Sequence, residues 1–339
     1  MISADAFPEE LGCVAIGRNE GERLRACLLS LLRAARPGAI AYVDSGSTDG
    51  SVEMARSLGV EVVALDLSIP FTAARARNAG YRHLMLKQPG LQLIQFVDGD
   101  CEIVPGWMEG ARVRLHERPE LAIACGRRRE RHPETSVFNR LCDVEWDTPI
   151  GDTRSCGGDA MIRLRALEEV GGYDPSLIAG EEPELCVRLR QRGWIIERLD
   201  AEMTLHDAAL TRISQWWRRQ VRSGHAYAEG VAMHGAPPER HNVAQYRRAI
   251  FWGLGVPLLA FGGALPTFGA SLALLGGYPL SGARQYYRAR RRGRSNRDAL
   301  VAGTLLTVGK FPELQGIFKF HWTRARGRRS GLIEYKHPG

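Results

Sequence analysis

The 339-residue sequence predicts an α/β protein: a Rossmann-like, mostly parallel sheet flanked by helices, followed by a helical, basic and hydrophobic C-terminal region. Two observations support this division. Apolar runs alternate with segments of helical spacing over the first 125 residues, a pattern typical of parallel βαβ units. The charge then reverses, because residues 1–209 hold 25 basic and 33 acidic side chains whereas residues 210–339 hold 21 and 5. The hydrophobic content of 44% excludes a disordered or collagen-like chain.

The elements follow from the spacing of apolar residues. The pattern predicts strands at 13–17, 40–43, 59–65 and 91–97, and helices at 22–32, 72–86 and 107–116. Basic, acidic and proline-containing stretches at 127–155 predict a loop-rich insertion or lid. The pattern resumes with a strand at 157–164, a helix at 185–192, and strands at 194–199 and 202–206. We therefore expect one domain at 1–210 and a second at 211–339.

The second domain begins with an Arg- and Trp-rich amphipathic segment, 212–233, and contains 35 consecutive uncharged residues, 249–283. This length permits a membrane span, which needs about 20 apolar residues. Internal Pro and Gly residues interrupt a smooth helix, however, and arginines on both flanks disfavour a single crossing. The sequence favours a hairpin that dips into a membrane, or two short interfacial helices. A buried helical pair of a soluble domain is the alternative.

The seven cysteines are scattered along the chain and form no Cys-x-x-Cys pair. The first ten residues have neither the basic region nor the apolar run of a signal peptide. Both features favour reduced thiols in the cytosol.

Polar residues follow three of the predicted strands. Residues 14–20 run from a strand into a polar turn, and open α/β sheets bind ligands at such strand ends. Asp44 ends the second strand, where a carboxylate can accept hydrogen bonds from a base or a ribose, while Asp49 is placed to cap the next helix. Asp98 and Asp100 follow the fourth strand, and two such carboxylates can hold a divalent cation that bridges two phosphates. An ordinary Asp-x-Asp turn is the alternative.

Three glutamates, Glu181, Glu182 and Glu184, open a later helix. The helix dipole favours acidic residues in a first turn, which explains the cluster without any function. A general base also needs a carboxylate at the edge of a pocket, so both interpretations stay open at this point.

Taken in order, these motifs resemble those of the family 2 glycosyltransferases of the GT-A fold, over about residues 10–210. The matching stretches are 14–20, 43–51, 74–80, 96–100, 157–160, 170–174 and 180–193. The resemblance implies an inverting enzyme of the hexosyltransferase class that takes a UDP- or GDP-type nucleotide-sugar donor and uses Mg²⁺ or Mn²⁺. It also implies a saccharide or lipid-linked acceptor in surface polysaccharide biosynthesis, with residues 1–210 as the nucleotide-sugar-binding catalytic domain.

The same resemblance implies roles for individual residues. Glu182 is the expected catalytic base; it stands where the family usually has Asp, so Glu181 and Glu184 remain candidates. Ser45 stands where many members have a second Asp, which leaves Asp44 as the sole acid for the base of the nucleotide. The expected donor-binding residues are Ile16, Arg18, Glu20, Asp44, Arg77, Asp98 and Gly99. The expected metal ligands are Asp100 and His206, with an ordinary hydrogen-bonding histidine as the alternative for the latter. The expected acceptor-side residues are Gly158, Asp159, Glu181, Trp217 and Arg218.

Residues 214–220 partly resemble the Gln-x-x-Arg-Trp motif of processive polysaccharide synthases, with Arg219 at the final Trp position. Trp216 and Trp217 beside arginines also suit a membrane interface, where indoles lie at headgroup level. Stacking on a sugar or contact with a diphosphate is the alternative. We expect an anionic membrane surface as a partner, and a location at the cytoplasmic face of the inner or plasma membrane.

Two other classes of protein are less well supported. A metal-dependent nucleotidyltransferase would carry a Gly-rich, Lys-bearing phosphate loop, which residues 17–21 do not supply. A non-enzymatic nucleic-acid-binding protein is suggested by the basic tail. The tail's arginines border a long apolar run, however, instead of alternating with isolated aromatic residues, so nucleic acid is not expected as a partner.

Overall fold

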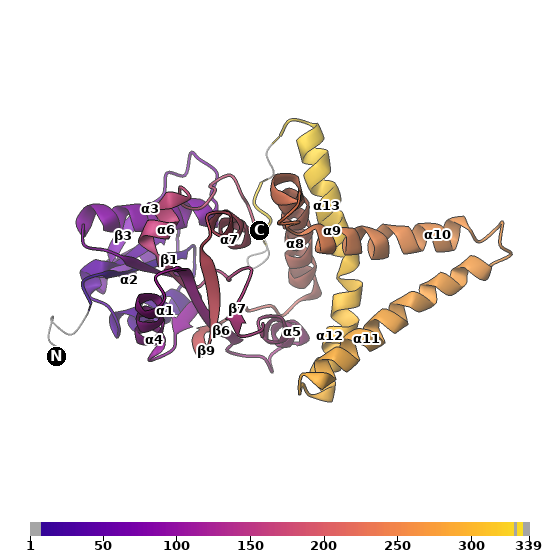
Figure 1. Cartoon of the computed structure of the whole chain (residues 1–339), viewed down its shortest axis with the longest axis horizontal. Helices are drawn as coiled ribbons and strands as arrows, with labels where there is room; N and C mark the ends of the chain where they lie inside the picture. The colour runs from indigo at the N-terminus through magenta and orange to yellow at the C-terminus, as the bar shows by residue number, and fades with distance from the viewer. Residues whose placement is uncertain (1–7, 329–330, 335–339) are drawn as a thin grey trace. The chain divides into compact units, whose positions relative to one another are not determined.

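A computed structural model describes residues 8–328 and 331–334. The chain forms two compact units (Figure 1). The first contains the residues up to Arg131 together with Trp146–Ala208, and the second contains His132–Glu145 together with the residues from Ala209 onward. The division expected from the sequence, at 210/211, leaves the segment 132–145 in the first domain, whereas the contacts of the chain place it in the second unit.

A single sheet of nine strands forms the centre of the first unit. Its order is β3-β2-β1-β4-β8-β6-β9-β5, and β7 pairs with β9. The strands are β1 Leu11–Gly17, β2 Ile40–Asp44, β3 Glu61–Ala64, β4 Leu93–Asp98, β5 Cys101–Ile103, β6 Leu121–Glu130, β7 Gly151–Asp152, β8 Ala160–Arg163 and β9 Ile195–His206.

The sheet is mixed, so the expectation of a mostly parallel sheet was wrong. Strands β3, β2, β1 and β4 are parallel, as the βαβ pattern predicted, and β6 is parallel to β9. Strand β8 runs antiparallel to both β4 and β6, and β5 and β7 run antiparallel to β9. Hydrophobic periodicity shows that a segment is a strand but not which way it runs beside its neighbour.

Helices of the first unit pack against this sheet and close its apolar core. They are α1 Glu22–Leu32, α2 Ser51–Ser57, α3 Ala73–Lys87, α4 Trp107–Glu117, α6 Leu164–Glu169 and α7 Glu181–Gln191. Helix α3 lies against β1 and β2 because Gly80 has no side chain: a Cβ there would come within 2.4 Å of Val14 Cγ1. All seven cysteines are buried and none forms a disulfide.

The segment 127–155 differs from the expected loop-rich lid. Its first residues complete strand β6, and it then forms helix α5 (Val137–Glu145) and the short strand β7. The two strands expected at 194–199 and 202–206 are one continuous strand, β9. Strand β6 itself was not predicted. Its last residues carry charge, and Arg127, Arg128 and Arg129 each pair with an acidic residue instead of lying in an apolar face.

The second unit is helical. Its elements are α5, α8 Ile213–His234, α9 Val243–Ile250, the π-helical segment η3 Phe251–Gly255, α10 Val256–Gly262, the 3₁₀ segment η4 Ala270–Gly276, α11 Gly277–Arg291, α12 Asn296–Val308 and α13 Lys310–Ala325. Helices α8 and α13 cross at two glycines. A Cβ at Gly224 would lie 1.9 Å from Glu313 O, and one at Gly316 would lie 2.0 Å from Val221 O.

Trp216 is part of the core of the second unit, so its expected place at a membrane interface was wrong. The side chain is 1% exposed and packs with Leu141 of α5 and Ala302 of α12. The neighbouring Trp217 is 36% exposed, and its indole N–H donates to Gln315 Oε1 at 2.7 Å.

Helices α10 and α11 extend from α8, α9 and α13 within the second unit and are joined by a turn (Figure 1). The uncharged run that the sequence shows at 249–283 occupies this feature. Among residues 8–328 and 331–334, no helix has both the length and the apolar character needed to cross a bilayer.

Candidate active site

The candidate site lies at the carboxyl ends of β1 and β4, the two adjacent parallel strands at the centre of the sheet. Asp98 is the last residue of β4, and Asp100 stands in the turn that leads to β5. The turn is held to β1 because Gly99 N–H donates to Ile16 O at 2.8 Å. A Cβ at Gly99 would lie 3.0 Å from the same oxygen, so glycine allows this close approach. The fold thus brings Asp98 and Asp100 to one sheet edge, as the sequence predicted.

Arg77 of α3 joins three acidic side chains in this site. Its guanidinium lies 2.8 Å from Asp98 Oδ1, 2.9 Å from Glu181 Oε1 and 3.0 Å from Glu182 Oε1. Burial alone would lower the pKa of Arg77, but the three carboxylates raise it well above its ordinary value. A permanently charged Arg77 therefore links α3 to the end of β4 and to the first turn of α7 through ion pairs.

Asp98 also meets a second guanidinium, that of the partly buried Arg128 on β6. Arg128 Nη2 lies 3.2 Å from Asp98 Oδ2 and 2.8 Å from Asp159 Oδ2. Arg128 was not predicted as a site residue, because it lies in the segment interpreted as a lid. The available signal was the run of three arginines directly after an apolar strand.

Asp159 holds Asp98 and Arg128 in position. Its side chain is fully buried. It accepts hydrogen bonds from the backbone N–H of Asp98 at 2.9 Å and from Thr204 Oγ1 at 2.7 Å. A buried carboxylate with these partners positions Asp98 and Arg128, and the acceptor-side role expected of Asp159 stays a prediction. Glu181 is likewise buried and bound to Arg77, and its acceptor-side role also stays a prediction.

Gly158 lies beside Asp98, Arg77 and Glu182, and a side chain at this position would push them apart. A Cβ at this position would come within 2.7 Å of Asp98 Oδ2, 2.8 Å of Arg77 Nη2 and 3.1 Å of Glu182 Oε1. The space around these atoms therefore depends on glycine. The acceptor-side role that the sequence predicted for Gly158 stays a prediction.

Glu182 is the most accessible acid of the first turn of α7. Its side chain is 14% exposed, against 4% for Glu181 and 3% for Glu184, and Glu184 binds Arg188 at 2.7 Å. Burial, and then the nearby charge of Glu181, raise the pKa of Glu182 to about 7. A carboxylate with this pKa is suited to accept a proton near neutral pH, since a general base works best when its pKa is close to the working pH.

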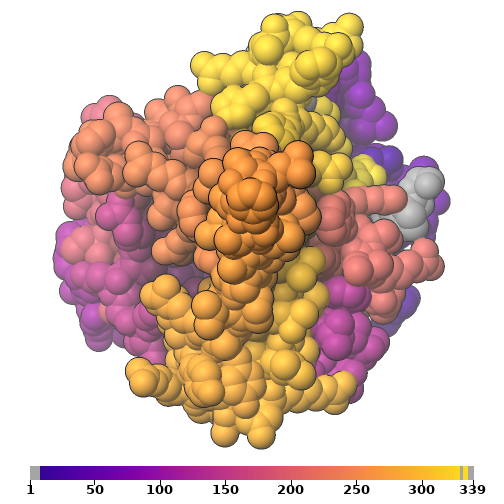
Figure 2. Space-filling view, turned by 90° about the vertical axis from the view of Figure 1, so that its right-hand side faces the viewer, coloured from indigo at the N-terminus to yellow at the C-terminus, as the bar shows by residue number. Residues whose placement is uncertain are grey.

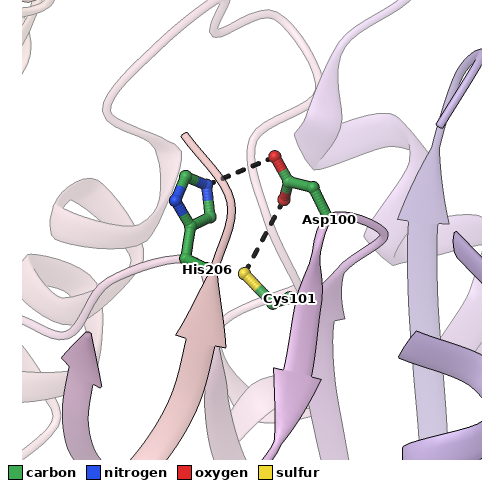
Figure 3. A group of neighbouring side chains, drawn as sticks. All are labelled: Asp100, Cys101 and His206. Carbon is green, nitrogen blue, oxygen red and sulfur yellow. Dashed lines mark hydrogen bonds and ion pairs between the residues drawn. The ribbon is translucent and has the colours of Figure 1, made fainter. Parts of the chain in front are cut away.

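Asp100, Cys101 and His206 form a second cluster beside the first (Figure 3). His206 Nε2 lies 3.2 Å from Asp100 Oδ2, and His206 Nδ1 lies 3.7 Å from Glu130 Oε2. The antiparallel register of β5 and β9 places Cys101 directly opposite His206, a pairing that the sequence alone does not show.

The chemistry of this cluster fits a divalent cation. The carboxylate of Asp100 and the imidazole of His206 offer oxygen and nitrogen ligands, a combination that Mn²⁺ accepts more readily than Mg²⁺ does. Burial raises the pKa of Cys101 well above its ordinary value, which favours the protonated thiol in the metal-free protein.

Comparison with known proteins agrees with this geometry. Residues 14–167 match the model of glycosyl transferase family 2. The chain is a glycosyltransferase with a family 2 domain. It is 24% identical over 231 residues to the succinoglycan biosynthesis protein ExoA of Rhizobium meliloti (strain 1021), covering 65% of this chain and 69% of that protein.

Two solved structures are also similar to this glycosyltransferase. The mannosyltransferase PcManGT from Pyrobaculum calidifontis, in complex with GDP-Man and Mn²⁺, has a TM-score of 0.57 at 17% identity and covers 93% of this chain and 88% of its own. TarS of S. aureus has a TM-score of 0.50 at 13% identity and covers 93% of this chain and 55% of its own. These likenesses establish the GT-A-like α/β fold.

Asp44, the residue expected to contact the base of the nucleotide, forms hydrogen bonds with neighbouring groups of the chain. Its carboxylate accepts hydrogen bonds from Tyr42 OH at 2.8 Å, Gly46 N at 2.9 Å and Ser47 N at 3.0 Å. Asp49 has the structural role expected of it, since it accepts from Ser51 N at 3.1 Å at the start of α2 and also from Gly21 N at 2.9 Å. Contact between Asp44 and a nucleotide base stays a prediction.

The remaining expected residues differ in their surroundings. Ile16 is buried, Glu20 pairs with Arg23 at 2.8 Å, and Arg18 is exposed at the same sheet edge. Trp217 and Arg218 belong to α8 of the second unit. Their acceptor-side roles stay predictions as well.

One aromatic residue beside the metal-type cluster was not predicted. The indole of Trp146 meets the imidazole of His206 edge to face, with ring centroids 4.7 Å apart. The guanidinium of Arg128 lies over the same indole at 5.6 Å. Trp146 thus packs between Arg128 and His206, the two side chains that border the aspartates.

Proposed function

We propose that this glycosyltransferase moves a sugar from a nucleotide-sugar donor to an acceptor hydroxyl with inversion at the anomeric carbon, and that Glu182 removes the proton of that hydroxyl. The observation that carries the proposal is the placement of Glu182, whose pKa is raised to about 7, beside the Arg77–Asp98 pair. An inverting displacement needs a base on the acceptor side and charge stabilisation on the leaving-group side.

The leaving-group side would be formed by Asp98, Gly99, Asp100 and His206. Asp100 and His206 would hold a divalent cation, Mg²⁺ or Mn²⁺, which when bound supplies positive charge to a departing diphosphate. The mannosyltransferase of similar fold contains Mn²⁺ with its GDP-Man. Arg77 and Arg128 hold Asp98 in place and keep the local charge balanced. Donor contacts by Ile16, Arg18, Glu20 and Asp44 complete the proposal.

The biological setting is suggested by the relative in succinoglycan biosynthesis. We propose a saccharide or lipid-linked acceptor and a role in the assembly of a surface polysaccharide. The second unit would keep the enzyme at the cytoplasmic face of the inner or plasma membrane. Basic residues near an anionic leaflet contribute about 1 kcal/mol each. Arginines flank the uncharged run at positions 247, 248, 284, 288, 290, 291, 292 and 294.

The proposal is tested with a panel of nucleotide sugars. One of them, together with Mn²⁺, should raise the unfolding temperature of the protein, because a ligand that binds only the folded state stabilises it. The same sugar nucleotide should support transfer, and NMR of the first product should show the anomeric configuration opposite to that of the donor. Retention of configuration would contradict the mechanism. Asp100→Asn should lose the Mn²⁺-dependent part of the stabilisation, and transfer that persists in a chelator would contradict the role of the metal.

A further inference from the structure

The longest exposed apolar feature of the described chain is a hairpin of the second unit, residues 251–283, which consists of η3, α10, a turn, η4 and the start of α11. It contains no charged residue. Figure 2, which is turned so that the hairpin points at the viewer, shows its orange atoms in front of the rest of the second unit. Its largest exposed side chains are Leu258, Leu259, Phe261, Leu265, Phe268 and Leu280. At the turn, Leu265 is 91% exposed and Phe268 is 101% exposed.

Apolar side chains surround α10 on nearly all sides. At 100° per residue, the exposed side chains at 258, 259 and 261 cover an arc of about 160°, and the other residues of α10 (Val256, Pro257, Ala260 and Gly262) add no polar side chain. The small residue Ala260 is buried and lies on the side that packs against η4, where Ser271 Oγ donates to Ala260 O at 2.7 Å. A helix that is apolar all round belongs in a protein core or in lipid, and no core of the described residues encloses this one.

Three of the four hydroxyl groups of the hairpin are satisfied internally, and the fourth belongs to Ser281, close to the arginines at its base. In residues 251–280 there are three hydroxyl-bearing side chains, and each donates to a backbone oxygen of the hairpin. Thr267 donates to Gly263 O, Ser271 to Ala260 O, and Tyr278 to Trp252 O at 2.6 Å. Hydroxyl groups exposed to water can form hydrogen bonds with water, whereas hydroxyl groups in hydrocarbon can form them only within the protein.

The backbone of the turn follows the same rule. The N–H groups of residues 267–270 all donate to carbonyl oxygens of residues 263–267, so the turn closes on itself. Pro266 has no N–H to satisfy. An irregular turn can enter the hydrocarbon layer only when its polar groups are paired in this way.

The charges at the base of the hairpin indicate which surface it meets. Exposed arginines stand on both sides of the uncharged run: Arg247, Arg248, Arg284, Arg288, Arg291 and Arg292. Basic side chains beside an apolar element match the anionic headgroups of a lipid leaflet. A protein partner or a second copy of the chain would not require this arrangement of charge.

We propose that residues 251–283 insert as a helical hairpin into one leaflet of an anionic membrane, with Leu265 and Phe268 at the deepest point. The arm formed by residues 251–262 is roughly 18 Å long at about 1.5 Å per residue. This length exceeds half of the hydrocarbon thickness of about 30 Å and falls well short of the whole, so the hairpin ends near the middle of the bilayer and returns to the same side. The inference rests on the membrane location proposed above and specifies the element that achieves it.

Vesicle flotation tests the proposal on the full-length protein. Wild type should float with vesicles of phosphatidylcholine containing about 30% phosphatidylglycerol, and less with phosphatidylcholine alone. The double change Leu265→Glu and Phe268→Glu should lower the bound fraction at least ~10-fold, since two fully exposed apolar side chains would have to carry charges into hydrocarbon. The matched control is Leu86→Glu, which alters a leucine of the first unit that is 87% exposed. It should float as wild type does.

Insertion depth is measured with a fluorophore attached at Phe268→Cys, since the seven native cysteines are buried. Lipids brominated near the ends of their acyl chains should quench it more than lipids brominated near the headgroup. The proposal fails if the wild type does not float, if the double variant floats equally well, or if quenching is strongest near the headgroup. It also fails if light scattering shows a vesicle-independent dimer that the double variant dissociates.

The outcome can be separated from that of the proposed function. Asp100→Asn should float normally and lose sugar transfer, whereas the double hairpin variant should lose flotation and retain transfer to a soluble acceptor. Normal flotation without transfer by the wild type would contradict the proposed function alone.

Discussion

Glu182 has three features together: its side chain is partly exposed, it lies in the first turn of α7, and burial and Glu181 raise its pKa to about 7. If it is the base, the active form is the deprotonated one. The rate of transfer should therefore rise with pH through about 7 and level off above it. Glu182→Gln should keep donor affinity and reduce turnover ~100-fold or more, because an amide accepts no proton.

Pre-steady-state rates and donor binding, each measured between pH 5 and 9, check this prediction. A pH profile unchanged in the Gln variant would show that another group is the base. If donor binding collapses together with turnover, Glu182 has a structural role instead.

The same raised pKa has a consequence for stability. Between about 4.5 and 7 the folded protein keeps a proton at Glu182 that the unfolded chain has lost, so stability falls as pH rises through this window. Glu182→Gln does not titrate. Its stability relative to wild type should therefore be greater at pH 8 than at pH 4.5, by ~1–3 kcal/mol at about 1.4 kcal/mol per pKa unit. Denaturant unfolding at the two pH values measures the difference, and an equal difference at both would contradict it.

Gly158 offers a test of the site that adds no charge. Gly158→Ala should push apart Asp98, Arg77 and Glu182, since the new methyl group would lie within 3.1 Å of all three. We expect transfer to fall at least ~100-fold, because displacements near 1 Å are costly at a reacting centre. The control is the neighbouring Gly157→Ala, which meets nothing within 4 Å. Equal activity in the two variants would argue against the site.

The sequence located the acidic residues of the site better than the basic side chains around them. Asp98, Asp100 and Glu182 follow a predicted strand end or open a helix, and the resemblance to family 2 glycosyltransferases implied their common location. Arg128 could not be found in this way, because its role depends on β6 lying next to β8, which Asp159 directly precedes. The pairing of His206 with Asp100 likewise depends on the antiparallel register of β5 and β9.

Among the elements, those with regular hydrophobic spacing were predicted closely. The helix expected at 22–32 is α1 with the same bounds. Strand β6 was not predicted; its charged last residues, whose arginines pair with acidic side chains, fell in the segment interpreted as a lid. Helix α5 was missed because its apolar face packs on α8 and α12, elements that follow much later in the chain. Local patterns cannot show a partner so distant in sequence.

The crossing of α8 and α13 should be the most sensitive contact of the second unit. Gly224→Ala would place a methyl group against the backbone of Glu313, and the two helices would have to separate. We expect a loss of ~1–3 kcal/mol, the range for overpacked cores. Hydrogen exchange should show faster exchange in both helices. As a control, Gly110→Ala lies at an open position of α4 and should stabilise the protein by ~0.5–1 kcal/mol.

For the whole molecule, the division into units predicts the effect of truncation. A chain ending at Leu210 would keep α5 but lose Trp216 and Ala302, which cover Leu141. It would also lose Asp298, which binds Arg140 at 3.0 Å. We expect such a chain to aggregate, as exposed apolar surface does, even though it carries the whole sheet. Size-exclusion chromatography checks this. Replacing residues 132–145 with a short polar linker in the same truncated chain should restore a monomer.

The path of the chain through its two units also has a consequence for folding during synthesis. Helix α5 leaves the ribosome before β8 and β9, the strands that complete the sheet, and Ala302 follows it by roughly 160 residues, or about 10–30 s at ordinary elongation rates. During that interval the cover over Leu141 is incomplete, because Trp216 and Ala302 both follow α5 in the chain. A nascent chain arrested within α8 should therefore be a preferred substrate for a holding chaperone, and one arrested beyond α13 should not.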